Sequence, residues 1–225
     1  MLRRVIGPLV FGVGGVAVLL ALGFWQLDRL EWKLGVIAAI DARIAEAPGP
    51  LPAEPDPEAD RYRAVTVGGD YSGEVVRVLS SRPGTGVGTL VIAVLETAEG
   101  RRVLVDRGFV ADAAPGVMDF AATGVTVTGN LLWPADSDSY TPAPDLEHGL
   151  WFSREVGPIA AHLGTEPVLI VARQDARVPG LLPRPIASAE VKNDHLGYAV
   201  TWFLLAAVWS VMTIGLLWRN RRNTA

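Results

Sequence analysis

The chain has 225 residues, half of them hydrophobic, a formal net charge of -4, and no cysteine. Without cysteine it can form no disulfide, no thiolate metal site and no covalent haem link through a C-x-x-C-H motif. All 24 acidic residues lie between Trp25 and Leu196, so the middle of the chain is acidic and nucleic acid is disfavoured as a partner. Five basic residues lie outside that region: Arg3, Arg4, Arg219, Arg221 and Arg222.

The N-terminal apolar run, residues 5–24, is long enough to cross a bilayer as a helix. We therefore predict a first transmembrane span over residues 1–25, with Pro8 in its first turn, where proline is tolerated. The alternative is a secretory signal peptide, because Ala21 and Gly23 give a weak small-x-small cleavage sequence. The run is longer than the usual apolar core of a signal peptide, which favours a retained anchor.

A second apolar run, residues 196–218, contains no charged residue and predicts a second span, followed by a basic tail over 219–225. Because arginine flanks both runs at the chain ends, the positive-inside rule predicts both termini in the cytoplasm and everything between the spans outside. The two spans then form a transmembrane hairpin. Small residues that would let them approach closely are Ala17 and Ala21 in the first and Ala206 and Ser210 in the second, with Gly12, Gly14 and Gly15 as further candidates.

Three segments join the spans to the middle of the chain. The helical spacing of apolar residues continues after the first span and predicts an interfacial helix over residues 26–47. Five prolines follow and predict an extended linker over 48–60. A second proline-bearing linker is predicted over 179–195.

Residues 61–178 change to a period of two, with β-branched runs separated by glycine, proline, aspartate or serine. The predicted strands are 61–67, 74–80, 89–96, 101–109, 125–132 and 168–173, with a turn at 83–88, a hairpin loop at 97–100 and a short helix at 156–163. This pattern predicts a small antiparallel β barrel or sandwich. The fold class is therefore an α+β membrane protein, a two-helix transmembrane hairpin with a β-rich outer domain.

Signals for catalysis are weak. The glycine-rich turn lacks the Lys-Ser/Thr of a phosphate-binding loop, and the chain has neither a Gly-x-Ser-x-Gly nor a His-Glu-x-x-His motif. His148 and His162 are interpreted as surface or capping residues, and Asp106, Asp112 and Asp119 as solvated loop residues. We expect no enzyme activity.

The entrance of the second span is more informative. His195 precedes the apolar run, and on a helix it shares one face with Tyr198, Trp202 and the small residues between them. Antiparallel spans also place the end of the first at the same depth in the membrane. The residues predicted to form one pocket are Trp25, Gln26, Arg29, His195, Tyr198 and Trp202. A neutral imidazole there can ligate iron and an arginine can pair with a haem propionate. The plainer alternative is an aromatic and basic interface belt with a histidine at the water line.

Three separated motifs resemble the surfeit-locus (Shy-type) family of cytochrome c oxidase assembly factors. Residues 23–33, GFWQLDRLEWK, resemble G-x-W-Q-x-x-R-x-x-W-K, and residues 193–202, NDHLGYAVTW, resemble N-x-H-x-x-Y-x-x-T-W. Residues 105–110, VDRGFV, resemble the R-G-[FW]-[VI]-P element, although Ala111 stands in place of its proline. Asp194 likewise stands where a second asparagine or another polar residue is common.

The resemblance implies a factor of the bacterial plasma membrane that assists haem a insertion into, or stabilisation in, subunit I of cytochrome c oxidase, alongside other assembly factors. It also implies that His195 is the haem a ligand. For Arg107 and Gly108 the open alternatives are a hairpin end, where glycine allows an unusual backbone angle, and a partner-facing surface. Two other functions remain open: an accessory protein that associates with the oxidase without binding haem, and a membrane-tethered envelope enzyme.

Overall fold

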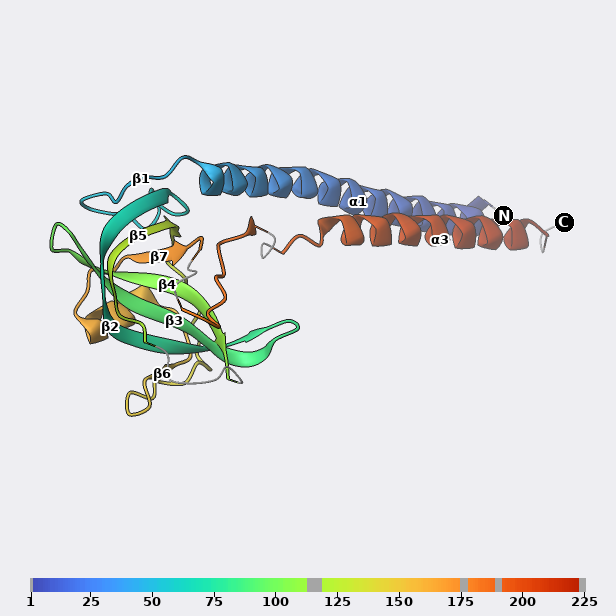
Figure 1. Cartoon of the computed structure of the whole chain (residues 1–225). Coiled ribbons are helices and arrows are strands. Elements are labelled where there is room, and N and C mark those ends of the chain that lie inside the picture. Colours follow the sequence, from blue (N-terminus) through green and yellow to red (C-terminus); the bar gives the residue numbers. More distant parts are fainter. Residues whose placement is uncertain (1, 113–118, 175–177, 189–191, 223–225) are drawn as a thin grey trace. The chain divides into compact units, whose positions relative to one another are not determined.

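The computed structural model of the chain describes residues 2–112, 119–174, 178–188 and 192–222. The chain divides into two compact units, one of residues 1–39 with 188–225 and one of residues 40–187. Two long helices make up most of the first, the helical unit, and strands with one short helix make up most of the second, the sheet unit (Figure 1).

Both long helices are long and apolar enough to cross a membrane. Helix α1 (Leu2–Ala45) contains the predicted first span and continues unbroken through the predicted interfacial helix, while α3 (His195–Arg222) contains the predicted second span. Within their most apolar windows only 11% and 6% of the residues are buried in the protein, as expected where apolar side chains face lipid. Proline at positions 48, 50 and 52 explains why α1 stops at Ala45, because proline cannot donate the helical hydrogen bond.

Glycines hold the two helices of the helical unit together. The helices run in opposite directions, so Gly12 faces Thr213, Gly15 faces Trp209 and Gly23 faces Phe203. A Cβ atom added at any of these glycines would lie well inside van der Waals contact with the facing side chain. Ala206 of α3 is buried as predicted, but Ala17 and Ala21 of α1 are exposed, so that part of the prediction is wrong. The rotation of α1 turns its glycine face, not its alanine face, toward α3.

The sheet unit contains seven strands and one helix in the part of the chain that the structure describes. They are β1 (Gly49–Pro50), β2 (Ala64–Arg82), β3 (Gly86–Thr97), β4 (Arg102–Ala111), β5 (Ala122–Leu131), β6 (Leu150–Trp151), α2 (Val156–Leu163) and β7 (Leu169–Ala172). The strand order is β1-β2-β3-β4-β7-β5, with β6 beside β2. Strand β2 also pairs with β5, so β2, β3, β4, β7 and β5 each have at least two hydrogen-bonded neighbours.

The sheet is mixed, so the purely antiparallel prediction is wrong. The pairs β2–β3, β3–β4, β2–β5 and β5–β7 are antiparallel, whereas β4–β7, β1–β2 and β6–β2 are parallel. Between β4 and β7 the chain passes through β5, β6 and α2, which supplies the long connection that a parallel pair requires. The hairpin predicted between β3 and β4 is confirmed, with Glu96 opposite Arg102.

Strand β2 joins two strands that the sequence predicts separately. Its first half pairs with β5 from Ala64 to Tyr71, and it pairs with β3 from Gly69 to Arg82. A bulge between Tyr71 and Val75 connects these halves. Gly73 lies within this bulge at φ +89°, a conformation that favours glycine, so the residue that predicts a break instead bends one continuous strand.

Alternating side chains of the strands fill two hydrophobic clusters. Val103 and Val105 of β4 belong to one cluster, and Leu104 belongs to the other. Helix α2, observed with the bounds that the sequence predicts, packs its Ile159 and Ala160 into the second cluster. Each face of β4 is thus covered, which explains why its residues from 103 to 109 are all buried.

Candidate functional site at one end of the helix pair

A hydrogen bond joins the two helices of the helical unit at the start of α3. The Nδ1 atom of His195, the first residue of α3, lies 2.7 Å from Oε1 of Gln26 in α1. The two residues are 169 positions apart in the chain and meet because the helices are antiparallel. Gln26 is only 9% exposed, and a buried polar group that is left unpaired costs free energy.

This contact defines the chemistry of the imidazole. The Gln26 oxygen is an acceptor only, so the Nδ1–H of His195 is the donor. In the neutral ring the lone pair is then on Nε2, the nitrogen that can ligate a metal or accept a proton. Histidine ligands of metals commonly donate their other ring N–H in this way, which fixes both tautomer and ring orientation.

The other residues of the predicted pocket are distributed around this pair. The guanidinium of Arg29 lies 3.9 Å from the ring centroid of Trp32, so it stacks on an aromatic side chain of its own helix. Trp25 and Tyr198 are 55% and 56% exposed, and Trp202 is half-buried. The structure therefore brings His195 and Gln26 into contact and leaves Trp25 and Tyr198 at the surface of the helical unit. Tyr198 does not share the buried face of α3 that includes Ala199 and Ala206.

One polar atom that the sequence did not single out lies two residues before His195. Asn193 Oδ1 is buried and has no hydrogen-bond partner among the residues that the structure describes. A buried acceptor without a donor is destabilising by about 1–3 kcal/mol. Asn193 is part of the same motif as His195, so the entrance of α3 holds both a metal-competent imidazole and an acceptor that a ligand could satisfy.

Within the described residues no group of three or more histidine, cysteine, aspartate or glutamate side chains could hold a bare metal ion. The entrance of α3 offers a single imidazole. Such a donor suits a metal that brings most of its ligands with it, as haem iron does. The donor set therefore fits a tetrapyrrole better than a free cation.

The Arg-Gly element lies inside the sheet unit, so neither the hairpin end nor the partner-facing surface is correct. Arg107, in the middle of β4, is fully buried, with its guanidinium 4.1 Å from the ring centroid of Tyr71. It also donates from Nη1 to the carbonyl oxygen of Phe120 at 2.8 Å. Gly108 has φ +125°, and an added Cβ would collide with the backbone of Leu182. The unusual backbone angle expected of this glycine is confirmed, at a strand bulge.

Asp106 is likewise buried rather than solvated. Its carboxylate accepts a hydrogen bond from the Gly108 N–H at 3.1 Å and lies 3.8 Å from Nη1 of Arg154. Burial raises the pKa of Asp106 to about 6, although the positive charge of Arg154 opposes the shift. Asp112 and Asp119 are exposed, as predicted. Asp106, Arg107 and Gly108 together form a buried polar segment that supports the fold of the sheet unit.

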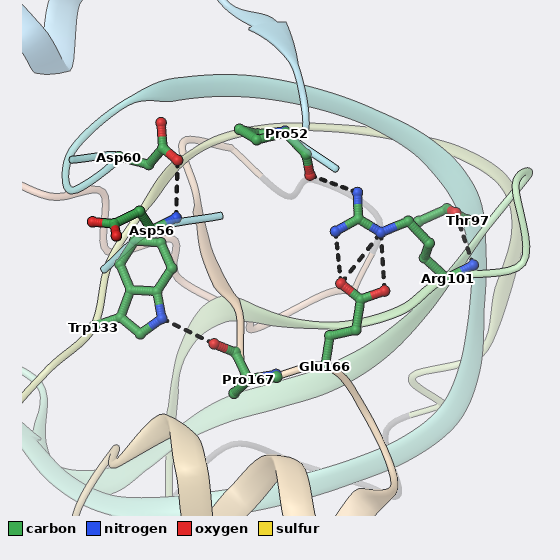
Figure 2. A network of polar contacts seen from close by, with 8 residues as sticks. All are labelled: Pro52, Asp56, Asp60, Thr97, Arg101, Trp133, Glu166 and Pro167. Atoms are coloured by element: carbon green, nitrogen blue, oxygen red, sulfur yellow. Dashed lines mark hydrogen bonds and ion pairs between the residues drawn. The ribbon is translucent and has the colours of Figure 1, made fainter. Parts of the chain in front are cut away.

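A second polar network fixes the segment predicted as a linker over residues 48–60 (Figure 2). Arg101 donates to Glu166 from Nε at 2.9 Å and from Nη2 at 2.6 Å, and from Nη1 to the Pro52 carbonyl at 2.7 Å. The ion pair lowers the pKa of Glu166 and raises that of Arg101. Because β1 also lies in this segment and pairs with β2, residues 48–60 are part of the sheet unit rather than a free tether.

The remaining histidines, His148 and His162, belong to the sheet unit. His148 is largely exposed and pairs with Asp145 at 2.9 Å. His162, in the last turn of α2, is exposed with its ring 5.6 Å from that of Trp151. Their predicted surface positions are confirmed.

Comparison with known proteins gives a consistent result. A model described as the SURF1 family matches residues 13–207. Surfeit locus protein 1 of Homo sapiens is 30% identical over 213 residues, which cover 85% of this chain and 71% of that protein. Surfeit locus protein 1 of Rattus norvegicus is 28% identical over 87% of this chain and 71% of its own length. A SURF1-like protein of Caenorhabditis elegans is 29% identical over 86% of this chain and 69% of its own.

Proposed function

Because the chain belongs to the SURF1 family, whose motifs its sequence resembles, we propose that it is a membrane-anchored assembly factor of cytochrome c oxidase. In this proposal it assists the insertion of haem a into subunit I, or its stabilisation there, and acts together with other assembly factors. It is not an enzyme. Haem a is its cargo, bound transiently.

The hydrogen bond between His195 and Gln26 carries the proposal. It directs the Nε2 lone pair of the imidazole away from Gln26 and holds the ring in one orientation, so that Nε2 would be available to hold haem iron. The bond also ties the ligand to α1, which would give the haem site a rigid base in both helices. Bound haem would supply the iron and the flat apolar ring; the chain supplies the ligand and its orientation.

Side chains around this pair suit the rest of the ligand. Trp25 and Tyr198 are more than half exposed, so their rings are accessible to a flat apolar partner, and Trp202 is half-buried on α3. Arg29 provides a cation that can pair with a propionate, stiffened by its stacking on Trp32. The buried acceptor of Asn193 adds a hydrogen-bonding position at the same helix end.

We also propose the location and the role of each unit. The two apolar helices would span the bacterial plasma membrane with both chain ends in the cytoplasm, as the flanking arginines favour. The sheet unit would then lie on the outer side and contact the oxidase. We propose that β2, β3, β4, β7 and β5, which each have at least two neighbours, form the small barrel predicted from the sequence. The membrane lipid is the third partner.

The test is the haem content of the full chain purified in mild detergent from cells that make haem A. We expect His195→Ala to lose most of the haem absorption, and Gln26→Leu to weaken haem affinity by roughly 10–100-fold, as is typical for the hydrogen-bond partner of a metal ligand. His148→Ala is the matched control, since this exposed histidine lies in the sheet unit, and it should keep full haem content. Circular dichroism of each variant would check that the fold is retained.

Unchanged haem content in a folded His195→Ala variant would contradict the ligand role. The accessory-protein alternative predicts a different result: the wild-type chain would co-purify with oxidase subunits but carry no haem. If a folded His195→Ala variant lost haem while His148→Ala kept it, the result would support the haem-binding proposal and exclude the accessory-protein alternative.

A further inference from the structure

The helical unit has a groove at the end opposite His195. It has a volume of about 380 Å³ and is lined mainly by apolar residues, including Pro8 and Phe11 of α1 and Trp209 and Leu216 of α3. Two glycines create it: Gly12 lies against Thr213, and Gly215 has no neighbouring atom within 4 Å of an added Cβ. Of the described residues that line it, Arg219 is the charged one.

Helix α3, which contains Arg219, has no acidic residue. The acidic residue that precedes Arg219 most closely in the chain is Asp194, which lies just before α3 and 25 positions earlier, or about 38 Å along a helix. On α1 no acidic residue precedes Asp28. A ligand that carries a negative group would find in Arg219 a cation with no acidic side chain of α3 beside it.

The dimensions of the groove match one leaflet of a bilayer. From Arg219 back to Trp209 is ten residues, or about 15 Å of helix, and half of a hydrocarbon core of about 30 Å is the same length. With Arg219 at the headgroup level, the apolar part of the groove reaches the middle of the membrane. An acyl chain has that length and that chemistry.

We propose that this groove binds an anionic phospholipid, with one acyl chain between α1 and α3 and the phosphate on Arg219. The inference rests on the membrane anchoring in the proposed function but not on haem binding. Arginine pairs well with phosphate through its planar guanidinium, and a basic residue near an anionic membrane surface contributes about 1 kcal/mol. The lipid would also link the two helices at the end remote from the His195–Gln26 bond.

A second groove of about 450 Å³ on the helical unit offers an internal comparison. It is lined by residues that include Val13, Ala17 and Ile214, and none of the described residues that line it is charged. By the same reasoning it accepts acyl chains without selecting a headgroup. Selectivity for anionic lipid is therefore expected at the groove with Arg219 alone.

The experiment is native mass spectrometry of the delipidated full chain titrated with phosphatidylglycerol or with phosphatidylcholine of identical acyl chains. We expect one tight phosphatidylglycerol adduct, weakened about fivefold by Arg219→Gln, which is the effect of losing about 1 kcal/mol. Gly215→Leu fills the groove without a clash and should remove the tight adduct. Ala17→Leu, in the uncharged groove, should leave it unchanged.

Three results would overturn the proposal. Equal affinity for the two lipids would show that Arg219 selects nothing. An equal loss on Arg222→Gln, whose guanidinium stacks on Trp218 at 3.8 Å, would show a general charge effect. A dimer in lipid-free samples that Gly215→Leu abolishes would assign the groove to a second copy of the chain. Haem content measured on the same Arg219→Gln sample separates this outcome from a failure of the haem proposal, because Arg219 lies far along α3 from His195.

Discussion

Burying the carboxyl group of Asp106 within β4 makes the stability of the fold depend on pH. Its pKa is raised to about 6 from an ordinary value of 3.8, mainly because burial disfavours the charged form. The folded state therefore holds a proton between about pH 4 and pH 6, where the unfolded chain has lost it. Stability from this group is present below pH 4 and is lost as the pH rises to 6.

We predict that Asp106→Asn gains stability relative to the wild type as the pH rises from 4 to 6, by on the order of 1–3 kcal/mol. Asparagine has a similar shape and keeps an acceptor for the Gly108 N–H, and Arg154 keeps its 2.7 Å contact with Asp136. The measurement is the thermal unfolding of the full chain in detergent at several pH values. Because Glu166, whose pKa is lowered, loses its contribution as the pH falls in both proteins, the difference between them isolates Asp106.

The matched control is Asp112→Asn, an exposed aspartate just beyond β4. Its stability difference from the wild type should not change over this pH range. If the stability difference between Asp106→Asn and the wild type stayed constant between pH 4 and pH 6, the protonated state of the buried carboxyl in the folded protein would be refuted.

Residue type alone does not reveal such burial. From their residue types, Asp106 and Arg107 are expected to be exposed to solvent, because charged residues are mostly exposed in folded proteins. Apolar residues flank them on both sides along β4, which was the available signal, but only the fold shows that Tyr71 and Phe120 cover Arg107. The unusual backbone of Gly108 was predictable, because glycine is the residue that tolerates positive φ.

At the scale of the elements, the helix pair depends on which face of α1 meets α3. Gly15 faces the indole of Trp209, whereas an added Cβ at Gly14 meets nothing within 4 Å. We predict that Gly15→Leu destabilises the pair by about 1–3 kcal/mol through overpacking, and that Gly14→Leu does not. Both variants add the same side chain to the same helix, so the changes in helix propensity and in side-chain hydrophobicity are the same in both and cancel in the comparison.

Near-UV circular dichroism of the full chain in detergent reports this prediction, because it follows the ordered packing of aromatic side chains. The Gly15→Leu signal should be lost at a lower temperature than that of either the wild type or Gly14→Leu. Equal midpoints for the two leucine variants would mean that the Gly15–Trp209 contact does not hold the helices together.

Whether a segment forms a helix or a strand was easier to predict than which strands pair with each other. The periodicity of 156–163 defines α2 with its observed bounds, because apolar residues three and four apart mark a helix face. The glycines of β2 predict a strand end, yet a bulge at Tyr71 to Val75 carries the strand onward. The parallel pair β4–β7 was not predictable, since it depends on contacts between residues more than sixty positions apart.

For the whole molecule, two apolar runs with basic flanks predict a hairpin, and a hairpin predicts that Gln26 and His195 lie at the same depth. That part of the candidate site follows from sequence, and the two residues are in contact. The rotation of each helix does not follow from sequence. It decides that Gln26 contacts the imidazole while Tyr198 faces outward, and it is set by glycine contacts spread along both helices.

The transmembrane hairpin leads to a final prediction about the side of the membrane on which the sheet unit and the C-terminal end lie. The chain has no cysteine, so single cysteines introduced into it can be labelled specifically. In intact spheroplasts, an impermeant maleimide should label Tyr140→Cys, because Tyr140 of the sheet unit is 89% exposed, and should label Asn223→Cys only after detergent is added. Labelling of Asn223→Cys in intact spheroplasts would reverse the topology.

Labelling alone does not distinguish an anchor from a cleaved signal peptide, because α3 by itself would give the same pattern. The mass of the intact protein does distinguish them, since cleavage after the small residues at 21–23 would remove most of the residues that pack on α3. Gly12 and Gly15 would be lost together with their contacts to Thr213 and Trp209, and Gln26 would lie near the new start of α1. We therefore expect the mature protein to retain residues 1–25, because this part of α1 contains Gly12 and Gly15, which face α3.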